Sequence, residues 1–197
     1  MSAAGSSDGG AAGDRPVLVL PGFGGSGADH WQSIWERRNP DFRRVEQRDW
    51  DAPDLVEWLD TLERAVDACR TPPLLVAHSL GCALVAHYAG KHAATLSGAL
   101  LVSPADIDEI SQFYTELESF APMPMEPLPF ATIVVASNDD MYVLVDRAEA
   151  FARAWGSRLV MLEGAGHINA ESGLGEWPLG RSLLTELLTD GDTVVRS

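Results

Sequence analysis

Short runs of apolar residues alternate along this chain with longer segments in which apolar residues recur every three or four positions. Fully apolar runs of this kind are typical of strands buried on both faces of a parallel sheet, and the longer spacing is typical of amphipathic helices. The segment at 43–48 is more polar, so we expect it near an edge of the sheet. The predicted strands are 17–20, 43–48, 74–77, 98–102, 132–136 and 158–162.

Amphipathic segments separate these strands. The first carries Trp31, Ile34 and Trp35 on one helical face, and Asp54 is a suitable N-cap for the second. The predicted helices are 30–38, 54–68, 82–91, 110–118, 144–155 and 179–188, while proline-rich 121–129 is expected to be a linker or flap. Strands that alternate with helices predict an α/β fold with a parallel sheet.

Length and composition indicate one globular domain. The chain has 197 residues, of which 46% are hydrophobic and 22% charged. Residues 1–14 are rich in Gly, Ala and Ser and lack the features of a targeting peptide, so we expect a disordered N-terminal tail there. The domain is expected at 15–190, with a C-terminal tail at 191–197.

Charge and cysteine content narrow the function. A formal net charge of −15 disfavours nucleic acid as a partner, because its phosphates would repel the chain. No basic amphipathic stretch or long apolar run indicates a membrane partner. Cys69 and Cys82 lie in no metal-ligand spacing, which predicts no metal site and suits reduced thiols in a cytoplasmic protein.

The glycine-rich loop at 21–27 follows the first predicted strand. Its spacing matches neither the G-x-G-x-x-G fingerprint nor the G-x-x-x-x-G-K-[ST] loop, and it carries no lysine. Nucleotide binding through this loop is therefore disfavoured, and we expect no cofactor.

Ser79 stands between the strand that ends at Ala77 and the helix-favouring run that begins at Cys82. This approximates the nucleophile elbow G-x-S-x-G, with Ala77 and Gly81 at the two small positions. Small neighbours are needed because the turn is strained and the serine must stand clear of the backbone. The alternative is that Ser79 only caps the helix, since serine is a favoured N-cap.

A serine nucleophile needs a base and a group that orients the base. Asp139 and Asp140 follow the strand at 132–136, and His167 follows the strand at 158–162. The carboxyl ends of parallel strands meet at one edge of a sheet, and the order serine, acid, histidine is that of α/β-hydrolases. These residues therefore predict a catalytic triad.

The other histidines fit this role less well. His30 and His92 are expected at the surface or at helix ends, and His87 lies within a helix. His78 adjoins Ser79, and a turn that projects one side chain outward usually turns its neighbour away. His78 is therefore expected to point away from the site.

Backbone N–H groups should stabilise the oxyanion of such a serine. Leu80 begins the helix after the serine, so its N–H is unsatisfied and lies at the positive end of the helix dipole. If the first strand lies beside the third, Phe23 in the loop at 22–25 supplies the second donor. Trp31, Phe113 and Tyr142 are candidates for an apolar substrate pocket, together with a flap that carries Met123 and Met125.

The chain resembles the α/β-hydrolase superfamily, and within it the small serine hydrolases of the YdeN type, whose vertebrate members are called retinoblastoma-binding proteins. The resemblance spans about 17–188 and departs from the pattern at Met141, where relatives often have proline. It implies Asp140, in the spacing D-x-x-V with Val143, as the acid. The matching residues are Pro21, Gly22, Gly25, Ser26, Gly27, Asp29, His30, Trp31, Gln32, Trp35, Asp49, Trp50, Pro53, Trp58, His78, Ser79, Leu80, Gly81, Asp140, Val143, Gly166 and His167.

From the residues and the resemblance together, we expect a three-layer sandwich. Its six-stranded parallel sheet has the order 2-1-3-4-5-6, and the fold is compact and has no large lid. The expected function is carboxylesterase-like hydrolysis of an ester, thioester or amide in a small-molecule acyl substrate, through an acyl-enzyme on Ser79. The alternatives are a protein-interaction module with a vestigial triad and a cofactor-free perhydrolase.

Overall fold

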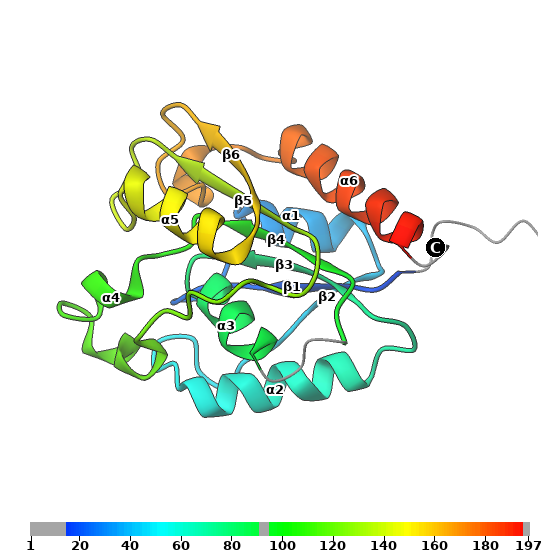
Figure 1. Cartoon of the computed structure of the whole chain (residues 1–197), viewed down its shortest axis with the longest axis horizontal. Coiled ribbons are helices and arrows are strands. Elements are labelled where there is room, and N and C mark those ends of the chain that lie inside the picture. The colour runs from blue at the N-terminus through cyan, green and yellow to red at the C-terminus, as the bar shows by residue number, and fades with distance from the viewer. Residues whose placement is uncertain (1–14, 91–94, 195–197) are drawn as a thin grey trace, which may run out of the picture.

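A computed structural model describes residues 15–90 and 95–194 of the chain. The predicted N-terminal tail at 1–14 lies outside the described residues, as does His92. Six parallel strands form one sheet in the order β2-β1-β3-β4-β5-β6, which confirms the predicted order (Figure 1). The strands are β1 (Val17–Leu20), β2 (Phe42–Arg44), β3 (Leu74–His78), β4 (Gly98–Val102), β5 (Thr132–Ser137) and β6 (Arg158–Leu162).

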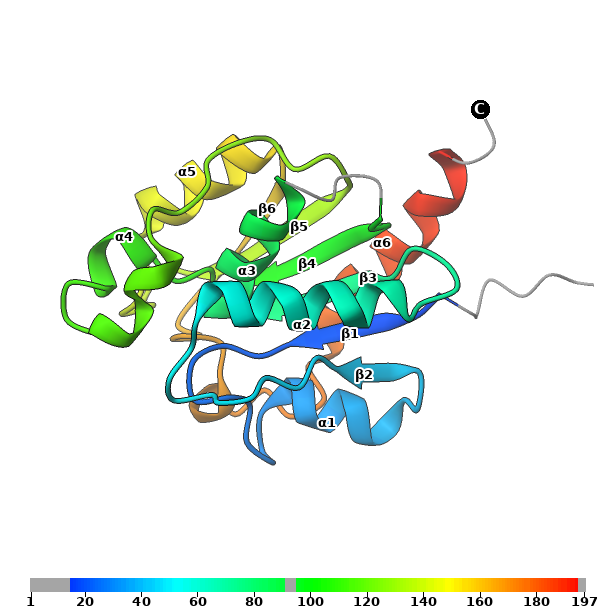
Figure 2. The ribbon, with the colours of Figure 1, turned by 90° about the horizontal axis from the view of Figure 1, so that it is seen from below.

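Helices cover both faces of the sheet, as the view in Figure 2 shows. Successive side chains of a strand point to opposite faces, so the buried strands contribute side chains to two separate hydrophobic cores, one on each face of the sheet. One core contains Leu75 and Ala77 and packs against α2, α3 and α5, whereas the other contains Leu74 and packs against α1 and α6. The longer helices are α1 (Trp31–Arg38), α2 (Leu55–Asp67), α3 (Leu80–Ala89), α5 (Val145–Trp155) and α6 (Pro178–Val194).

The edge strand is shorter than the segment predicted at 43–48. β2 runs from Phe42 to Arg44, and one further N–H, that of Val45, donates to Val19 O at 2.9 Å. β1 ends at Leu20, and Pro21 has no N–H with which to extend the pairing. The chain therefore leaves the sheet where its partner strand ends.

The single helix predicted at 110–118 is wrong. The chain instead forms a short helix, α4 (Ile107–Ile110), and a 3₁₀ turn, η1 (Thr115–Phe120). Ile107 of the first and Leu117 of the second both pack into the core. A second 3₁₀ turn, η2 (Ala170–Ser172), precedes α6.

The last helix is longer than predicted. α6 ends at Val194, whereas the sequence pattern places its end near Leu188, so the helix includes the first four residues of the predicted tail at 191–197. Residues 195–197 lie outside the described range. Among the helices that the structure describes, none combines the length and apolar character needed to cross a membrane.

Candidate active site

Ser79 sits at the sharp turn between β3 and α3. Its backbone is held at φ 55° and ψ −120°, a conformation that a non-glycine residue rarely adopts. A Cβ on Gly81 would lie 2.4 Å from Leu20 O, and a Cβ on Gly22 would lie 2.8 Å from the Cβ of Ser79. The end of β1 therefore presses against the elbow so closely that both positions require glycine.

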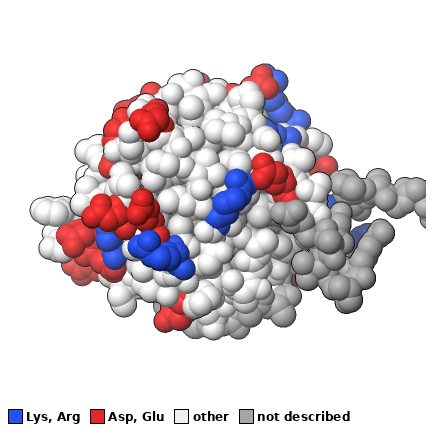
Figure 3. Space-filling view, turned by 45° about the horizontal axis from the view of Figure 1, so that its top comes forward, with Lys and Arg blue, Asp and Glu red and all other residues white. Residues whose placement is uncertain are grey.

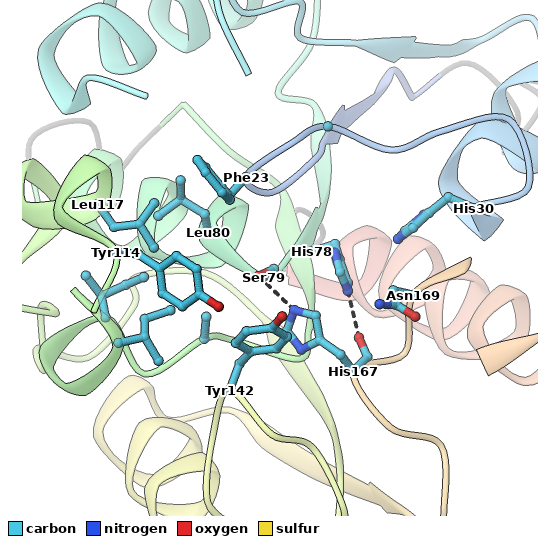
Figure 4. A pocket seen from close by; sticks show the side chains of 14 residues that line it. Phe23, His30, His78, Ser79, Leu80, Tyr114, Leu117, Tyr142, His167 and Asn169 are labelled. Atoms are coloured by element: carbon cyan, nitrogen blue, oxygen red, sulfur yellow. Dashed lines mark hydrogen bonds between the residues drawn. The ribbon is translucent and has the colours of Figure 1, made fainter. Parts of the chain in front are cut away.

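Ser79 does not act as a side-chain cap. It occupies the N-cap position of α3, but its hydroxyl makes no capping hydrogen bond. Its Oγ instead lies 2.9 Å from Nε2 of His167 (Figure 4). The alternative interpretation of Ser79 as a helix cap therefore has no support in the geometry.

His167 links Ser79 to a buried carboxylate. Its Nδ1 lies 2.9 Å and 2.8 Å from the two carboxylate oxygens of Asp140, whose side chain is fully buried. A carboxylate accepts a hydrogen bond, so the Nδ1 proton is fixed and Nε2 is left to accept from the serine hydroxyl. The Tyr142 N–H also donates to Asp140 at 2.9 Å. The three side chains thus form one hydrogen-bonded chain from carboxylate to hydroxyl.

The neighbouring aspartate has a different set of contacts. Asp139 accepts from the Ser137 hydroxyl at 2.6 Å and from the Gly166 N–H at 2.8 Å. These two hydrogen bonds lower the pKa of the Asp139 carboxyl. The structure therefore brings Asp140 to His167, whereas Asp139 ties the loop that carries the histidine to the end of β5.

The loop at 164–166 before His167 is held by hydrogen bonds from each of its backbone N–H groups. The Ala165 N–H donates to the Ser137 hydroxyl and the Gly164 N–H donates to the Asn138 side chain, each at 2.9 Å. Gly164 and Gly166 both have positive φ, which lets successive amides turn toward β5. Three consecutive side chains at the end of β5, those of Ser137, Asn138 and Asp139, therefore hold three consecutive N–H groups before His167.

The two backbone amides predicted to stabilise an oxyanion lie in segments that meet at the elbow. Leu80 is the first residue of α3, and Phe23 lies in the loop after β1, which is hydrogen-bonded to β3. The Gly25 N–H donates to Gly22 O at 3.0 Å and the Gly24 N–H to Trp50 O at 2.9 Å, which fixes the loop. Within residues 15–90 and 95–194, no protein acceptor takes the N–H of Phe23 or Leu80.

Two histidines that sequence reasoning set aside lie at the site. His78 was expected to point away from the site, but it lines the cavity, and its Nε2 donates to the carbonyl oxygen of His167 at 2.9 Å. His30 is 4% exposed and not a surface residue, although it does cap a helix: its Nδ1 accepts from the Gln32 N–H at 3.2 Å. His87 lies 2.8 Å from the carbonyl oxygen of Phe120, away from this cluster.

Burial keeps both histidines neutral. Desolvation lowers the pKa of His30 to about 4, with smaller contributions from Arg44 and His167. Desolvation also lowers the pKa of His78 well below its usual value, and the neighbouring His167 and His30 add to the effect. The rings form a row, with centroids 4.7 Å apart for His30 and His78 and 4.8 Å apart for His78 and His167.

A cavity of about 240 Å³ opens beside Ser79 and His167. Tyr142 lines it as predicted, with its ring centroid 4.6 Å from that of His167. Trp31 is instead a core residue, 1% exposed, whose indole N–H donates to Ile168 O at 2.8 Å. Phe113 is 81% exposed and lies off the cavity. The lining residues are Phe23, Gly25, His30, His78, Ser79, Leu80, Ala105, Ile107, Ile110, Tyr114, Leu117, Tyr142, His167 and Asn169.

The predicted methionine flap does not reach this cavity. Met123 is buried in the core and its N–H donates to Asp108 at 2.8 Å, while Met125 is 39% exposed, and neither lines the cavity. Among the described residues, no group of three or more His, Cys, Asp and Glu side chains could hold a metal ion.

Comparisons with known proteins agree with this geometry. A family model described as serine hydrolase matches residues 17–186. A search of curated proteins finds no match. Among solved structures, a YdeN-like hydrolase from Pectobacterium atrosepticum is 35% identical, with a TM-score of 0.81 over 90% of this chain and 92% of that one.

Two further solved structures share the fold at lower identity. The ydeN gene product of B. subtilis is 22% identical, with a TM-score of 0.74 over 89% of this chain and 99% of that one. Est1E from Butyrivibrio proteoclasticus is 14% identical, with a TM-score of 0.68 over 89% of each chain.

Proposed function

The chain belongs to the serine hydrolase family, within the α/β-hydrolase superfamily, and we propose that it is a carboxylesterase-like enzyme. It cleaves an ester, thioester or amide bond of a small-molecule acyl substrate through an acyl-enzyme on Ser79. Its catalytic triad is Ser79, His167 and Asp140.

One observation carries this proposal. Ser79 Oγ lies 2.9 Å from His167 Nε2, and His167 Nδ1 lies 2.8 Å from a buried oxygen of Asp140. A serine hydroxyl is a weak nucleophile until a base takes its proton, and the base works only in the correct tautomer. The distances and the burial of Asp140 supply both conditions in the free protein.

In the first half of the reaction, Ser79 Oγ attacks the acyl carbon while His167 Nε2 takes the hydroxyl proton. The carbonyl oxygen becomes an oxyanion and accepts hydrogen bonds from the N–H groups of Phe23 and Leu80. The tetrahedral intermediate then collapses, the bond to the leaving group breaks, and His167 returns the proton to the departing oxygen, sulfur or nitrogen.

In the second half, water replaces the leaving group. His167 takes a proton from the water, the hydroxide attacks the acyl carbon, and the same two N–H groups stabilise the second oxyanion. Collapse releases the carboxylic acid and restores the proton to Ser79. Asp140 stabilises the imidazolium throughout and remains ionised.

A fluorophosphonate probe tests this function. The proposal predicts labelling at Ser79, found by mass spectrometry of the peptide that contains it, and no labelling of a folded Ser79→Ala variant. Hydrolysis of at least one member of a panel of aryl esters, acyl thioesters and aminoacyl amides should be lost in the same variant. Folded wild-type protein that is neither labelled nor active would contradict the proposal.

A further inference from the structure

One buried hydrogen-bond donor at the cavity has no partner. His30 lines the cavity, and its Nε2 makes no hydrogen bond with any residue that the structure describes. The other ring nitrogen, Nδ1, accepts from the Gln32 N–H and therefore carries no proton in the neutral ring. The proton of the neutral imidazole is thus on Nε2. Because an unpaired buried donor is costly, a ligand that supplies an acceptor would be favoured there.

The residues around His30 make one side of the cavity polar. His78 donates through Nε2 to the carbonyl oxygen of His167, so its Nδ1 is an acceptor. Asn169 presents a side-chain amide whose oxygen accepts from the Glu171 N–H, which leaves its NH₂ group toward the cavity side. In Figure 4 the ring of His30 is directed toward His78 and Asn169.

The opposite side of the cavity is apolar. It is built mainly from the segment after β4 and from the first residue of α3, with the rings of Phe23 and Tyr114 beside it (Figure 4). The side chains of this apolar side are Leu80, Ala105, Ile107, Ile110 and Leu117. Ser79 and His167 lie between the two sides.

We propose that the Nε2–H of His30 donates a hydrogen bond to an uncharged oxygen in the leaving group of the substrate. The polar side formed by His30, His78 and Asn169 then binds the leaving group, and the apolar side binds a compact acyl group. The preferred substrate is an ester whose alcohol carries an ether, hydroxyl or carbonyl oxygen. This inference rests on the proposed hydrolysis at Ser79.

The position of the general acid assigns the leaving group to the polar side. His167 must protonate the departing atom, so that atom lies against the imidazole. His78 is the next ring in the row from His167, and His30 follows it. A leaving group that extends past His167 along this row meets the ring of His30 where that ring lines the cavity.

The charges of the molecule favour an uncharged oxygen. His30 is neutral above about pH 4, so it offers a neutral donor rather than a cation for a carboxylate or phosphate. The net charge is −15, and acidic side chains are spread over the face in Figure 3, with the largest group at its left end beside basic side chains. This field repels anionic substrates.

Two isosteric esters of the same short acid test the proposal. The 2-methoxyethyl ester has an ether oxygen where the n-butyl ester has a methylene group, and the two are otherwise matched in length. We expect wild-type kcat/KM to be about tenfold higher for the 2-methoxyethyl ester, which is the effect of one neutral hydrogen bond. A ratio near one would overturn the inference.

Two variants of His30 test whether the Nε2–H of His30 causes the higher kcat/KM for the 2-methoxyethyl ester. His30→Asn keeps an acceptor close to the position of Nδ1, which caps α1, but has no donor at the position of Nε2. His30→Gln places an amide N–H near Nε2 but does not reproduce the cap. We expect the ratio to fall to about one in His30→Asn and to stay within about threefold of wild type in His30→Gln. Equal ratios in all three proteins would contradict the assignment to His30.

The outcomes also separate this inference from the proposed function. Cleavage of both esters at equal rates, with Ser79 labelled by a fluorophosphonate, would overturn only the role of His30. Cleavage of neither ester, with Ser79 unlabelled in folded protein, would overturn the proposed function and this inference together.

Discussion

Two regions that face each other across the cavity are held in different ways. The site rim consists of residues 78–80, 137–140 and 164–168, and the cavity wall is the segment 103–121 after β4. In the rim, backbone N–H groups of one loop donate to side chains of the next, as the Gly166 N–H does to Asp139 at 2.8 Å. The rim is therefore fixed by short contacts between adjacent strand ends.

The wall depends on side chains that reach it from elsewhere. Arg147 of α5 donates to the two oxygens of buried Asp106 at 2.7 Å and 2.8 Å, and to Asp108 at 2.9 Å. The Ser119 hydroxyl accepts from the Leu55 N–H at 3.1 Å. We therefore expect the rim to determine the chemistry and the wall to determine which acyl group binds, so that the wall can change while the rim stays intact.

The largest expected effect comes from removing the nucleophile in the rim. Ser79→Ala should reduce kcat by at least about 10⁴-fold, because loss of one triad member disables the whole unit. The thermal unfolding midpoint should stay within a few degrees of wild type, since the lost hydroxyl makes no capping bond. A folded variant with most of its activity would contradict the assignment of Ser79.

The two adjacent aspartates provide a matched pair within the rim. Asp140→Asn should lower kcat by about 10³- to 10⁴-fold, because an amide oriented toward Nδ1 disfavours the required tautomer of His167. Asp139→Asn should lower kcat by less than about tenfold, because it only loosens the Gly166 contact. Steady-state kinetics of both variants decide, and a larger loss in Asp139→Asn would reverse the assignment.

Removing the ion pair that holds the cavity wall should change KM more than kcat. Arg147→Gln leaves the Asp106 carboxylate, 3% exposed, without its ion pair, and should lower the free energy of unfolding by about 2 kcal/mol. We expect KM to rise severalfold with kcat within about twofold of wild type. Arg153→Gln, on the exposed face of the same helix, is the control and should change neither. A fall in kcat with unchanged KM in Arg147→Gln would show that wall and rim are not separable.

The buried histidines behind the rim should make stability depend on pH. The folded protein resists protonation of His30 down to about pH 4, whereas the unfolded chain takes up that proton near pH 6.5. Stability is therefore fully present above pH 6.5 and falls as the pH drops toward 4, by about 2 kcal/mol from His30 between pH 7.5 and 5. Urea unfolding at the two pH values gives the loss of unfolding free energy between pH 7.5 and 5. We expect this loss to be about 2 kcal/mol smaller in His30→Asn than in wild type. An unchanged difference would contradict the neutral, buried state of His30.

The smallest expected effect measures strain in the rim. Ser79 has a φ of 55°, which glycine adopts without strain and alanine does not. Ser79→Gly should therefore be more stable than Ser79→Ala by about 1 kcal/mol, in spite of the greater flexibility of glycine in the unfolded chain. Urea unfolding of the two inactive variants gives the comparison, and a less stable glycine variant would argue against strain.

The residues of the rim could be predicted from the sequence more completely than those of the wall. Apolar runs mark the strands, and the family resemblance supplies their order. Ser79, Asp140 and His167 each follow such a run, so the ends of parallel strands bring them together. The wall has no such local signal. Phe113 is apolar yet exposed at a bend, and Trp31 is buried under the histidine loop instead of lining the cavity. Both outcomes depend on tertiary packing.

The histidine row was missed for a similar reason. Burial of a polar side chain is decided by neighbours far away in the sequence, and nothing local marks His78 as buried. A usable signal was the position of His30 directly before an amphipathic helix and beside Gln32, whose amide donates to Leu20 O at 3.2 Å and to Val76 O at 3.0 Å. A glutamine held between two strand ends fixes the start of α1, and with it His30, against the rim.

A crystal structure of the protein after reaction with a p-nitrophenyl alkylphosphonate would show whether Ser79 and the two amides act as proposed. We expect phosphorus bonded to Ser79 Oγ, with the phosphoryl oxygen within about 3.1 Å of the N–H groups of both Phe23 and Leu80. The alkyl group should lie against the apolar side of the cavity. A phosphoryl oxygen that faces solvent or contacts only side chains, or an adduct on another residue, would contradict the account.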